Sequence, residues 1–328
     1  MPKPKESKEH YDTEYWERMA DIEHQMVDGI SLKDRIDKEV DLVLDHADLN
    51  LKPGDKVLDL ASGTGPHAIQ LAKRTGADVQ GRDVAQTLVD IANQEVQDET
   101  REKILNVNFE LGNYSDVKDS IEPGQKFKCI TIFGSSFIYL KSHEEYQKAL
   151  QDFYDILEPG GKLVIQWREK NQYFSAENRK LSSDEEVNKR GYQWVPLEEG
   201  KKDTFSRTAH GPMCWKKPTD TEEGYGMYVT EGEQGSNQHP YQDIPGPEGD
   251  LDYFSFGRVY VDNNRHELPV PSTSGLSFLD TSKLPLMERM ITEAGFLSPK
   301  LIPGKEGVDL SKDGYRRLFA IVAEKPVN

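Results

Sequence analysis

Apolar positions in the first fifty residues recur at the spacing of amphipathic helices. Two stretches show this period, Tyr15–Val27 and Leu32–Ala47. In the second stretch Asp and Lys residues lie opposite one apolar face, which consists of Ile36, Val40, Val43, Leu44 and Ala47. The pattern predicts two helices ahead of the first Pro-Gly pair in the chain.

Short apolar runs and helical stretches then alternate as far as residue 167. The runs predicted as strands are Val57–Leu60, a run that begins at Val79, Val107–Leu111, Phe127–Phe133 and Leu163–Trp167. The stretches predicted as helices are Ala68–Lys73, Ala85–Val96 and Glu144–Leu157. Strands that alternate with helices are typical of a parallel α/β sheet with helical crossovers.

The alternation stops after about residue 171. Residues 171–250 are rich in Gly, Pro, Glu and aromatic residues and show no clear helix. Tyr253–Val261 alternates as a strand does, and a helix near Leu284–Ala294 and a strand near Leu318–Val322 resume the α/β pattern. We therefore predict one α/β core with an insertion of about 100 residues, which is long enough to form a lid.

The composition is that of a globular protein with an acidic surface. The chain has 328 residues, with 41 Lys and Arg against 58 Asp and Glu, so its net charge is −17. This charge argues against nonspecific binding to nucleic acid or to anionic lipid, because both bind basic patches. Ordinary solubility explains the acidic surplus, and adaptation to high salt is the alternative.

The sequence also argues against several other classes of protein. It has no run of about 20 apolar residues that could cross a membrane. Its charged beginning, MPKPKESKEH, lacks the apolar segment of a secretory signal. Two cysteines, Cys129 and Cys214, are too few for a disulfide framework or a multi-cysteine metal site. We expect a cytoplasmic protein that needs no metal and binds neither nucleic acid nor membrane, and we leave a homo-oligomer open.

The most informative stretch is a glycine-rich turn between the first predicted strand and the next helix. It reads VLDLASGTGPHA over Val57–Ala68. Its glycines permit a tight turn and let a ligand approach the backbone closely. Asp83 follows Gly63 by 20 residues, where a carboxylate can bind ribose hydroxyls. Taken alone, the turn also fits the GxGxxG/A pattern of nicotinamide-dependent dehydrogenases.

The residues around this turn resemble the class I S-adenosylmethionine-dependent methyltransferases. DLASGTG resembles their first motif, and three further stretches follow in the family's order: Gly81–Val84, Phe109–Tyr114 and Leu157–Leu163. The resemblance implies a Rossmann-like α/β fold with a seven-stranded, mostly parallel sheet, and S-adenosyl-L-methionine as co-substrate. The cofactor-binding residues that it implies are Asp59, Ala61, Gly63, Thr64, Gly65, Asp83, Val84, Asn113, Tyr114 and Phe133.

A narrower resemblance concerns the acceptor side. Phe133–Leu140, which reads FGSSFIYL, is similar to the L-G-N-S-F-x-H-L segment of glycine and sarcosine N-methyltransferases. Their arginine after the fifth strand implies that Arg168 clamps a substrate carboxylate, and their N-terminal arginine implies that Arg35 binds the cofactor's carboxylate. Ser135 and Tyr139 then face the acceptor, although these enzymes have Asn and His there.

These residues also have simpler interpretations. Arg168 could be a surface arginine, and Asp34 and Asp37 offer Arg35 ordinary surface partners. The aromatic residues of the insertion suit a cage for a cationic ligand, but they also suit the packing of a Gly-rich lid.

The resemblance implies that different segments of the chain have different roles. Residues 1–50 form N-terminal helices that cap the site, residues 51–170 and 281–328 form the cofactor-binding core, and residues 171–280 form the inserted substrate lid. The predicted function is methyl transfer to a small amino acid or amine that carries a carboxylate, as in glycine-type N-methylation. The alternatives are S-methylation of a thioether amino acid such as methionine, and a non-catalytic module that senses S-adenosylmethionine.

Overall fold

A computed structural model describes most of the predicted core and parts of the insertion. The described residues are 32–99, 105–134, 136–140, 143–168, 192–195, 213–216, 224–232, 252–261, 267–268, 273–277, 284–303, 308–309 and 317–327. The helix predicted over Tyr15–Val27 lies outside them. The second predicted helix is present as α2 (Leu32–His46).

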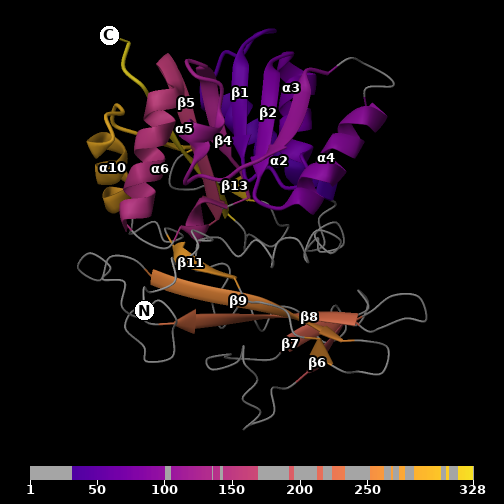
Figure 1. The fold of residues 1–328 in the computed structure, drawn as a ribbon. Helices are drawn as coiled ribbons and strands as arrows, with labels where there is room; N and C mark the ends of the chain where they lie inside the picture. Colours follow the sequence, from indigo (N-terminus) through magenta and orange to yellow (C-terminus); the bar gives the residue numbers. More distant parts are fainter. Residues whose placement is uncertain are drawn as a thin grey trace, which may run out of the picture.

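The core is a sheet in the order β12-β14-β5-β4-β1-β2-β3, with the short β13 paired to β14 (Figure 1). Its strands are β1 (Lys56–Leu60), β2 (Asp78–Asp83), β3 (Val107–Leu111), β4 (Phe127–Ile132), β5 (Leu157–Arg168), β12 (Lys300–Ile302), β13 (Val308–Asp309) and β14 (Arg317–Glu324). Strands β1 to β5 pair in parallel, whereas β14 runs antiparallel to β5 and β12. The predicted seven-stranded, mostly parallel sheet is confirmed, with β13 as a two-residue addition.

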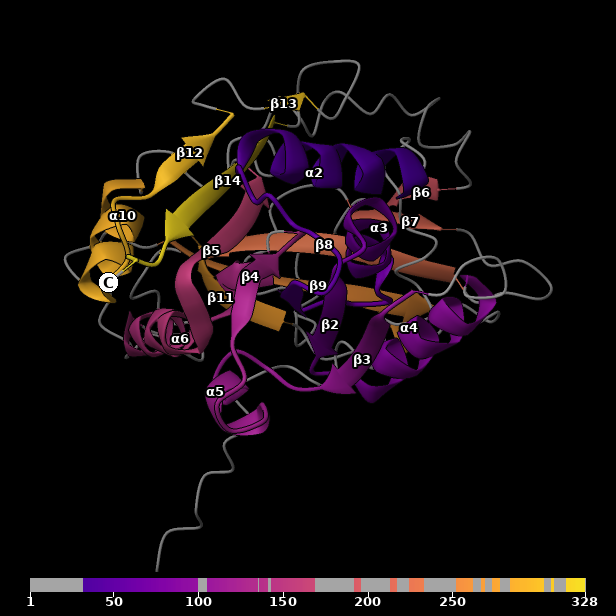
Figure 2. The same ribbon diagram turned by 90° about the horizontal axis from the view of Figure 1, so that it is seen from above.

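Helices cover both faces of this sheet (Figure 2). Apolar residues of α2, α3 (Pro66–Thr75) and α4 (Gln86–Glu99) pack on one face. Those of α6 (His143–Ile156) and α10 (Leu284–Glu293) pack on the other. The strands alternate accordingly: Val57 faces α2 and α3, and Leu58 faces α6. This alternation fixes which strand residues can reach a ligand from each side.

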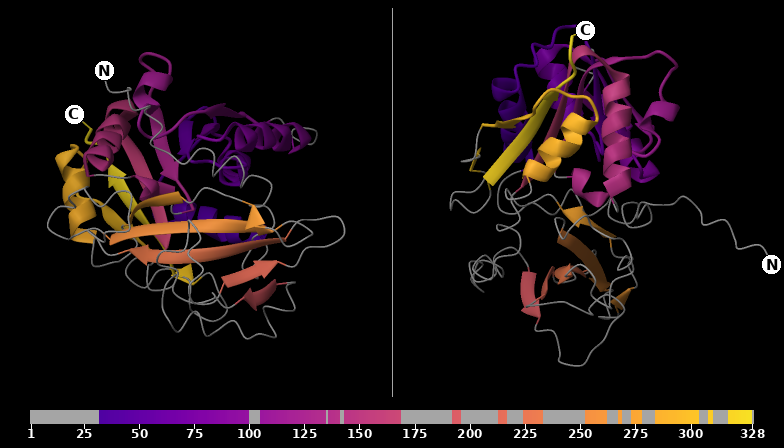
Figure 3. Two further views of the ribbon diagram at one scale, coloured as in Figure 1. Left: turned by 60° about the horizontal axis from the view of Figure 1, so that its bottom comes forward. Right: turned by 90° about the vertical axis from the view of Figure 1, so that its left-hand side faces the viewer.

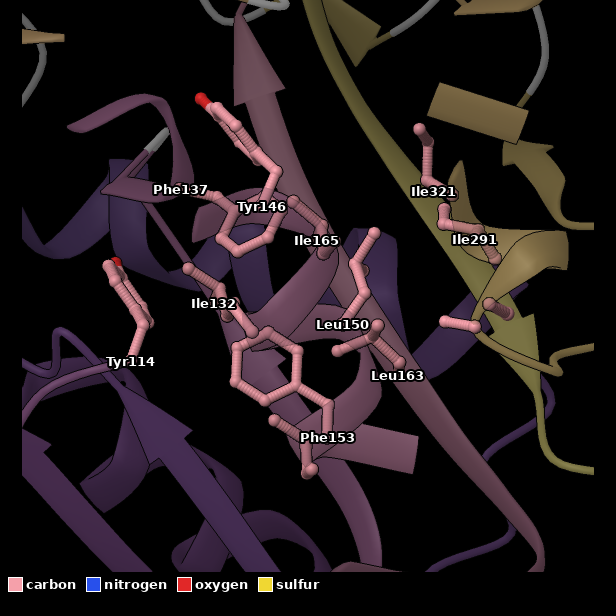
Figure 4. Close-up of a cluster of buried hydrophobic side chains, with 14 of the residues drawn as sticks. Tyr114, Ile132, Phe137, Tyr146, Leu150, Phe153, Leu163, Ile165, Ile291 and Ile321 are labelled. Atoms are coloured by element: carbon pink, nitrogen blue, oxygen red, sulfur yellow. The ribbon is translucent and has the colours of Figure 1, made fainter. Parts of the chain in front are cut away.

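The core on the α6 face is built around aromatic residues (Figure 4). Phe137 meets the rings of Tyr114 and Tyr146 edge to face, with centroids 5.7 and 5.1 Å apart. Phe137 belongs to η1 (Ser136–Tyr139), the 3-10 turn that follows β4. The packing therefore anchors the chain just beyond the carboxyl end of β4.

A second sheet lies next to the core, on the side of η1 (Figures 1 and 3). It is antiparallel, in the order β10-β9-β8-β7-β6 with β11 paired to β9. Its strands are β6 (Tyr192–Val195), β7 (Met213–Lys216), β8 (Gly224–Gly232), β9 (Asp252–Val261), β10 (Glu267–Leu268) and β11 (Thr273–Ser277). Strand β11 contacts η1, so this sheet covers the core where β4 ends.

Two parts of the chain differ from the sequence prediction. Strands β6, β7 and β8 lie in the stretch for which no regular pattern was recognised, because their pairing is with distant residues rather than local. Strand β5 begins at Leu157, ahead of the turn expected at Pro159-Gly160-Gly161. There the backbone exchanges hydrogen bonds with Lys325, from Gly160 N to Lys325 O and from Lys325 N to Gly161 O, both 2.9 Å. Among the described helices, none is long and apolar enough to span a membrane.

Candidate functional site

The predicted glycine-rich turn joins the carboxyl end of β1 to α3. Ala61, Gly63 and Gly65 have left-handed φ values of 54°, 55° and 86°, and Pro66 begins the helix. The turn is closed by a hydrogen bond from Gly65 N to Ser62 O of 2.9 Å and tied to β2 by one from Ser62 N to Arg82 O of 3.0 Å. The backbone therefore leaves the strand in a sharp loop that only small residues allow.

The ring of Phe109 on β3 packs against two of the glycines. A Cβ atom at Gly65 or at Gly81 would lie 2.3 Å from a carbon of this ring. Such a contact is far inside van der Waals distance, so both positions require glycine as long as Phe109 is in place. In the sequence, Phe109 stood out only as the first residue of the turn that follows.

Asp83 ends β2 and faces the glycine-rich turn. Its Oδ2 accepts a hydrogen bond from Gly63 N at 2.8 Å, and its Oδ1 accepts one from Ala85 N at 3.1 Å. A carboxylate has about four lone-pair sites, so it can accept further bonds. The structure thus places Asp83 beside the loop, as the spacing predicted. Val84, which follows it, and Thr64 in the loop are half-buried.

Asp59 lies in β1 directly before the turn and is 1% exposed. Its Oδ1 accepts a hydrogen bond of 2.7 Å from the hydroxyl of Thr131 on β4. Burial raises the pKa of Asp59 to about 6, while nearby His67 and the Thr131 hydrogen bond act to lower it. Neither Asp59 Oδ2 nor the buried hydroxyl of Ser62 has a hydrogen-bond partner within the described part of the chain. These two atoms are suited to meet polar groups of a ligand.

A buried contact between two polar side chains supports the loop from the α2 side. Glu39 Oε2 on α2 lies 2.6 Å from His67 Nε2 on α3. The ring of His67 stacks on that of Phe133 with centroids 4.4 Å apart and planes 6° apart. Neither Glu39 nor His67 was predicted from the sequence. The position of His67 two residues after Gly65 was the available signal for it.

The two residues predicted to bind the cofactor in the turn after β3 have different surroundings. Asn113 stabilises the turn, since its Oδ1 accepts hydrogen bonds from Ser115 N and Ser115 Oγ at 2.7 and 2.6 Å. Tyr114 is 5% exposed and packs in the core. Beyond this turn, the buried Arg82 contacts the end of helix α5 (Val117–Ser120), with its Nη1 2.5 Å from Ser120 Oγ. Contact of either predicted residue with adenine stays a prediction.

The residues predicted around the methyl acceptor are described only in part. Phe133 directly follows β4 and is buried, and Tyr139 is half-buried against the α6-side core. Ser135 lies outside the described residues. Arg168 is the last residue of β5 and pairs with Leu318 of β14, and Arg35 lies in the first turn of α2. The side chains of both arginines lie outside the described part of the chain.

One more buried polar side chain lies at this end of the sheet. Gln166 on β5 is 0% exposed, and its Oε1 accepts a hydrogen bond of 2.6 Å from Gly134 N. A glutamine in the otherwise apolar run Leu163–Trp167 was a signal in the sequence that the prediction did not use. No group of three or more His, Cys, Asp and Glu among the described residues could hold a metal ion.

Comparison with known proteins bears directly on this site. Residues 57–161 match the methyltransferase domain family, and this segment contains the glycine-rich turn, Asp59 and Asp83. This part of the core is therefore similar to a methyltransferase domain.

Two curated relatives cover the same region. A ubiquinone/menaquinone biosynthesis C-methyltransferase of Escherichia fergusonii is 36% identical over 120 residues, which are 35% of this chain and 43% of that protein. A demethylmenaquinone methyltransferase of Thermus thermophilus is 34% identical over 130 residues, 39% of this chain and 51% of that protein. The chain thus spans about half the length of the curated relatives that it matches.

A solved structure resembles nearly the whole chain. The CcbJ methyltransferase from Streptomyces caelestis superposes with a TM-score of 0.58 at 16% identity, over 96% of this chain and 98% of its own. At this identity the likeness shows the fold alone, and it confirms the predicted Rossmann-like methyltransferase fold. None of these three proteins is named as a glycine or sarcosine N-methyltransferase, so that narrower resemblance stays a prediction.

Proposed function

We propose that this protein transfers a methyl group from S-adenosyl-L-methionine to a small amino acid or amine. The observation that carries the proposal is the loop of Ala61–Gly65, which lies at the carboxyl end of β1 with Asp83 hydrogen-bonded to it. In open parallel sheets, ligands bind at the carboxyl ends of the strands. The loop belongs to the segment that matches the methyltransferase domain family.

The described residues fit the cofactor. Gly63 and Gly65 carry no side chains, so an adenosine can approach the backbone of the loop closely. Asp83 would accept hydrogen bonds from the ribose hydroxyls, and Asp59 Oδ2, which has no partner among the described residues, would meet the cofactor's ammonium group. We further assign Thr64, Val84, Asn113, Tyr114 and Phe133 to its binding, together with Arg35.

When bound, S-adenosylmethionine supplies an electrophilic methyl group and a neutral thioether as leaving group. The protein's part is to align the acceptor atom with that methyl and to exclude water, and positioning of this kind can contribute about 7–11 kcal/mol. The second sheet serves this purpose as a lid, since β11 lies against η1. An amine acceptor must arrive unprotonated, and its product loses a proton after the new N–C bond has formed.

We propose an acceptor that carries a carboxylate, as in glycine-type N-methylation. The support is Arg168 at the carboxyl end of β5, because a guanidinium binds a carboxylate through two parallel hydrogen bonds. Ser135 and Tyr139 complete the proposed acceptor side. S-methylation of methionine would keep the carboxylate contact and would need no base, since a thioether carries no proton.

The test uses the purified protein and S-adenosylmethionine with a labelled methyl group. Glycine, sarcosine, dimethylglycine, methionine and β-alanine are offered separately, and labelled products are identified by mass. We expect label on nitrogen of glycine or sarcosine. Label on sulfur would retain the carboxylate contact but overturn N-methylation. Cofactor binding with no label on any compound would favour a larger acceptor or a non-catalytic sensor.

A further inference from the structure

Only one half of the Gln166 amide has a hydrogen-bond partner among the described residues. Its Oε1 accepts the hydrogen bond from Gly134 N at 2.6 Å. Its Nε2 is buried and has no hydrogen-bond partner among the described residues. A buried donor without a partner costs about 1–3 kcal/mol, so the orphan Nε2 needs an explanation from outside the described protein atoms.

The Oε1 atom of Gln166 stabilises a turn in the backbone. Gly134 is the first residue after Phe133 and has a left-handed φ of 66°. By accepting from its N–H, Gln166 fixes the turn that leads from β4 into η1. An amide that served this turn alone would leave its nitrogen in water or in a second protein contact, and Gln166 is 0% exposed.

The register of the sheet places Gln166 on the ligand side. Ile132 pairs with Ile165, and Thr131 pairs with both Val164 and Asp59. Side chains two residues apart share a face, so Gln166 lies on the same face as Thr131 and Asp59. That face carries the carboxyl-end residues Asp59 and Phe133.

The unpartnered atoms on this face are complementary. Asp59 on β1 offers an acceptor oxygen, Oδ2, and Gln166 on β5 offers a donor nitrogen, Nε2. Strand β4 lies between these two strands. An acceptor for an ammonium and a donor for a carboxylate at the same end of one sheet are what an α-amino-acid group requires.

We propose that Gln166 is a ligand-binding residue whose Nε2 donates to a carboxylate oxygen in this site. The inference rests on the proposed function, in which two molecules carry such a group. One source is the methionine end of the cofactor, and the other is an amino-acid acceptor. The same donor chemistry serves either, and binding experiments separate them.

The decisive variant is Gln166→Glu. Glutamate keeps an oxygen that can accept from Gly134 N, but it replaces the donor with a second oxygen. Calorimetric titration compares S-adenosylhomocysteine with 5′-methylthioadenosine, which lacks the amino-acid end. We expect the variant to bind S-adenosylhomocysteine at least about tenfold more weakly and methylthioadenosine within about twofold, because only the former offers a carboxylate to the lost donor.

Two further proteins keep this test interpretable. Gln147→Glu is the matched control, because Gln147 lies away from the loop on α6, where its Nε2 donates to Met290 O at 3.4 Å. It should change the binding of neither compound. Gln166→Met removes both the donor Nε2 and the acceptor Oε1 without adding charge. If the glutamate variant melts at a much lower temperature, the methionine variant should still show weaker binding of S-adenosylhomocysteine and retained binding of methylthioadenosine.

The outcomes show whether the carboxylate belongs to the cofactor or to the acceptor. They also distinguish a failure of the role proposed for Gln166 from a failure of the proposed function. Unchanged S-adenosylhomocysteine binding with a KM for the acceptor raised about tenfold assigns the donor to the acceptor's carboxylate. Unchanged binding without such a rise in KM, or equal weakening of both nucleosides, overturns the role of Gln166. A wild-type protein that binds neither nucleoside overturns the proposed function, and this inference with it.

Discussion

Glu39 and His67 meet inside the protein, with Oε2 and Nε2 2.6 Å apart. Glu39 is 0% exposed and His67 7%, so water does not separate them. Because the His67 ring also stacks on Phe133, the contact joins α2, the start of α3 and the end of β4. The first described helix is thereby linked to both the glycine-rich turn and the carboxyl end of β4.

Removal of Glu39 should therefore destabilise the protein substantially. We expect Glu39→Ala to lower the free energy of unfolding by about 2–4 kcal/mol, because it leaves His67 buried without its partner. Urea denaturation of wild type and variant measures the difference. Asp41→Ala is the control, since Asp41 pairs with Arg74 across the same two helices but at the surface. It should cost less than about 1 kcal/mol, and equal losses would contradict the role given to burial.

The stability of the protein should depend on the protonation of Asp59. Burial raises its pKa from 3.8 to about 6, so the folded state holds this proton more tightly than the unfolded state. This contribution is fully present below about pH 4, falls as pH rises from 4 to 6, and amounts to about 3 kcal/mol in all. The difference in unfolding free energy between Asp59→Asn and wild type, measured from pH 4 to 7, should grow by that amount. A constant difference would contradict the raised pKa.

The same carboxyl should make cofactor binding pH-dependent. If the ammonium of S-adenosylhomocysteine meets Asp59 Oδ2, binding favours the ionised carboxylate and releases its proton. The affinity should therefore rise between pH 5 and pH 7 in wild type and stay nearly level in Asp59→Asn. Calorimetric titration at three pH values measures the affinity of both proteins. If the affinity of wild type and of the variant changed with pH in the same way, Asp59 would not contact the ligand.

Gly65 should tolerate no side chain. Gly65→Ala introduces a Cβ 2.3 Å from the Phe109 ring at a φ of +86°, so it should lose most binding of S-adenosylhomocysteine. Gly54→Ala is the matched control, because Gly54 has a φ of +88° and nothing within 4 Å of its added Cβ. The control carries the backbone strain alone, about 1–2 kcal/mol, and should bind normally. Partial rescue of Gly65→Ala by Phe109→Leu would identify the clash as the cause.

Asp83 should contribute directly to cofactor affinity. We expect Asp83→Asn to weaken S-adenosylhomocysteine binding by roughly 1–3 kcal/mol, because the ribose hydroxyls would lose a charged acceptor. The amide oxygen can still accept from Gly63 N, so the contact with the loop is retained, whereas the hydrogen bond from Ala85 N is lost. Asp90→Asn, an exposed position on α4, serves as the control. An unchanged affinity in the Asp83 variant would show that Asp83 does not contribute to cofactor binding.

Local pattern sufficed for the parallel core. The strand predicted over Val107–Leu111 has those bounds in the structure, and α2 begins at the predicted residue. Hydrophobic periodicity succeeds there because each element buries one side against the same core. The glycine-rich turn and Asp83 were also readable, since a tight turn and a strand end have local sequence requirements.

Apart from β9, which the alternation over Tyr253–Val261 predicted, the second sheet and the contacts that support the site could not be predicted from local pattern. Strand β8 pairs with β9 across the gap between residues 232 and 252, and no local period shows which strand is its partner. Phe109 explains Gly65 and Gly81 only once the sheet brings β3 against the loop. The motif predicted the glycines, but not the side chain that requires them.

The α/β alternation, the loop after β1 and the acidic residue after β2 depend on neighbours along the chain, so they could be read from the residues alone. Which buried polar groups meet depends on the assembled fold. Glu39 and His67 are 28 residues apart, and Gly134 and Gln166 are 32. The energy of each pair comes from burial and from contact across separate elements, and neither property exists until the sheet and its covering helices have come together.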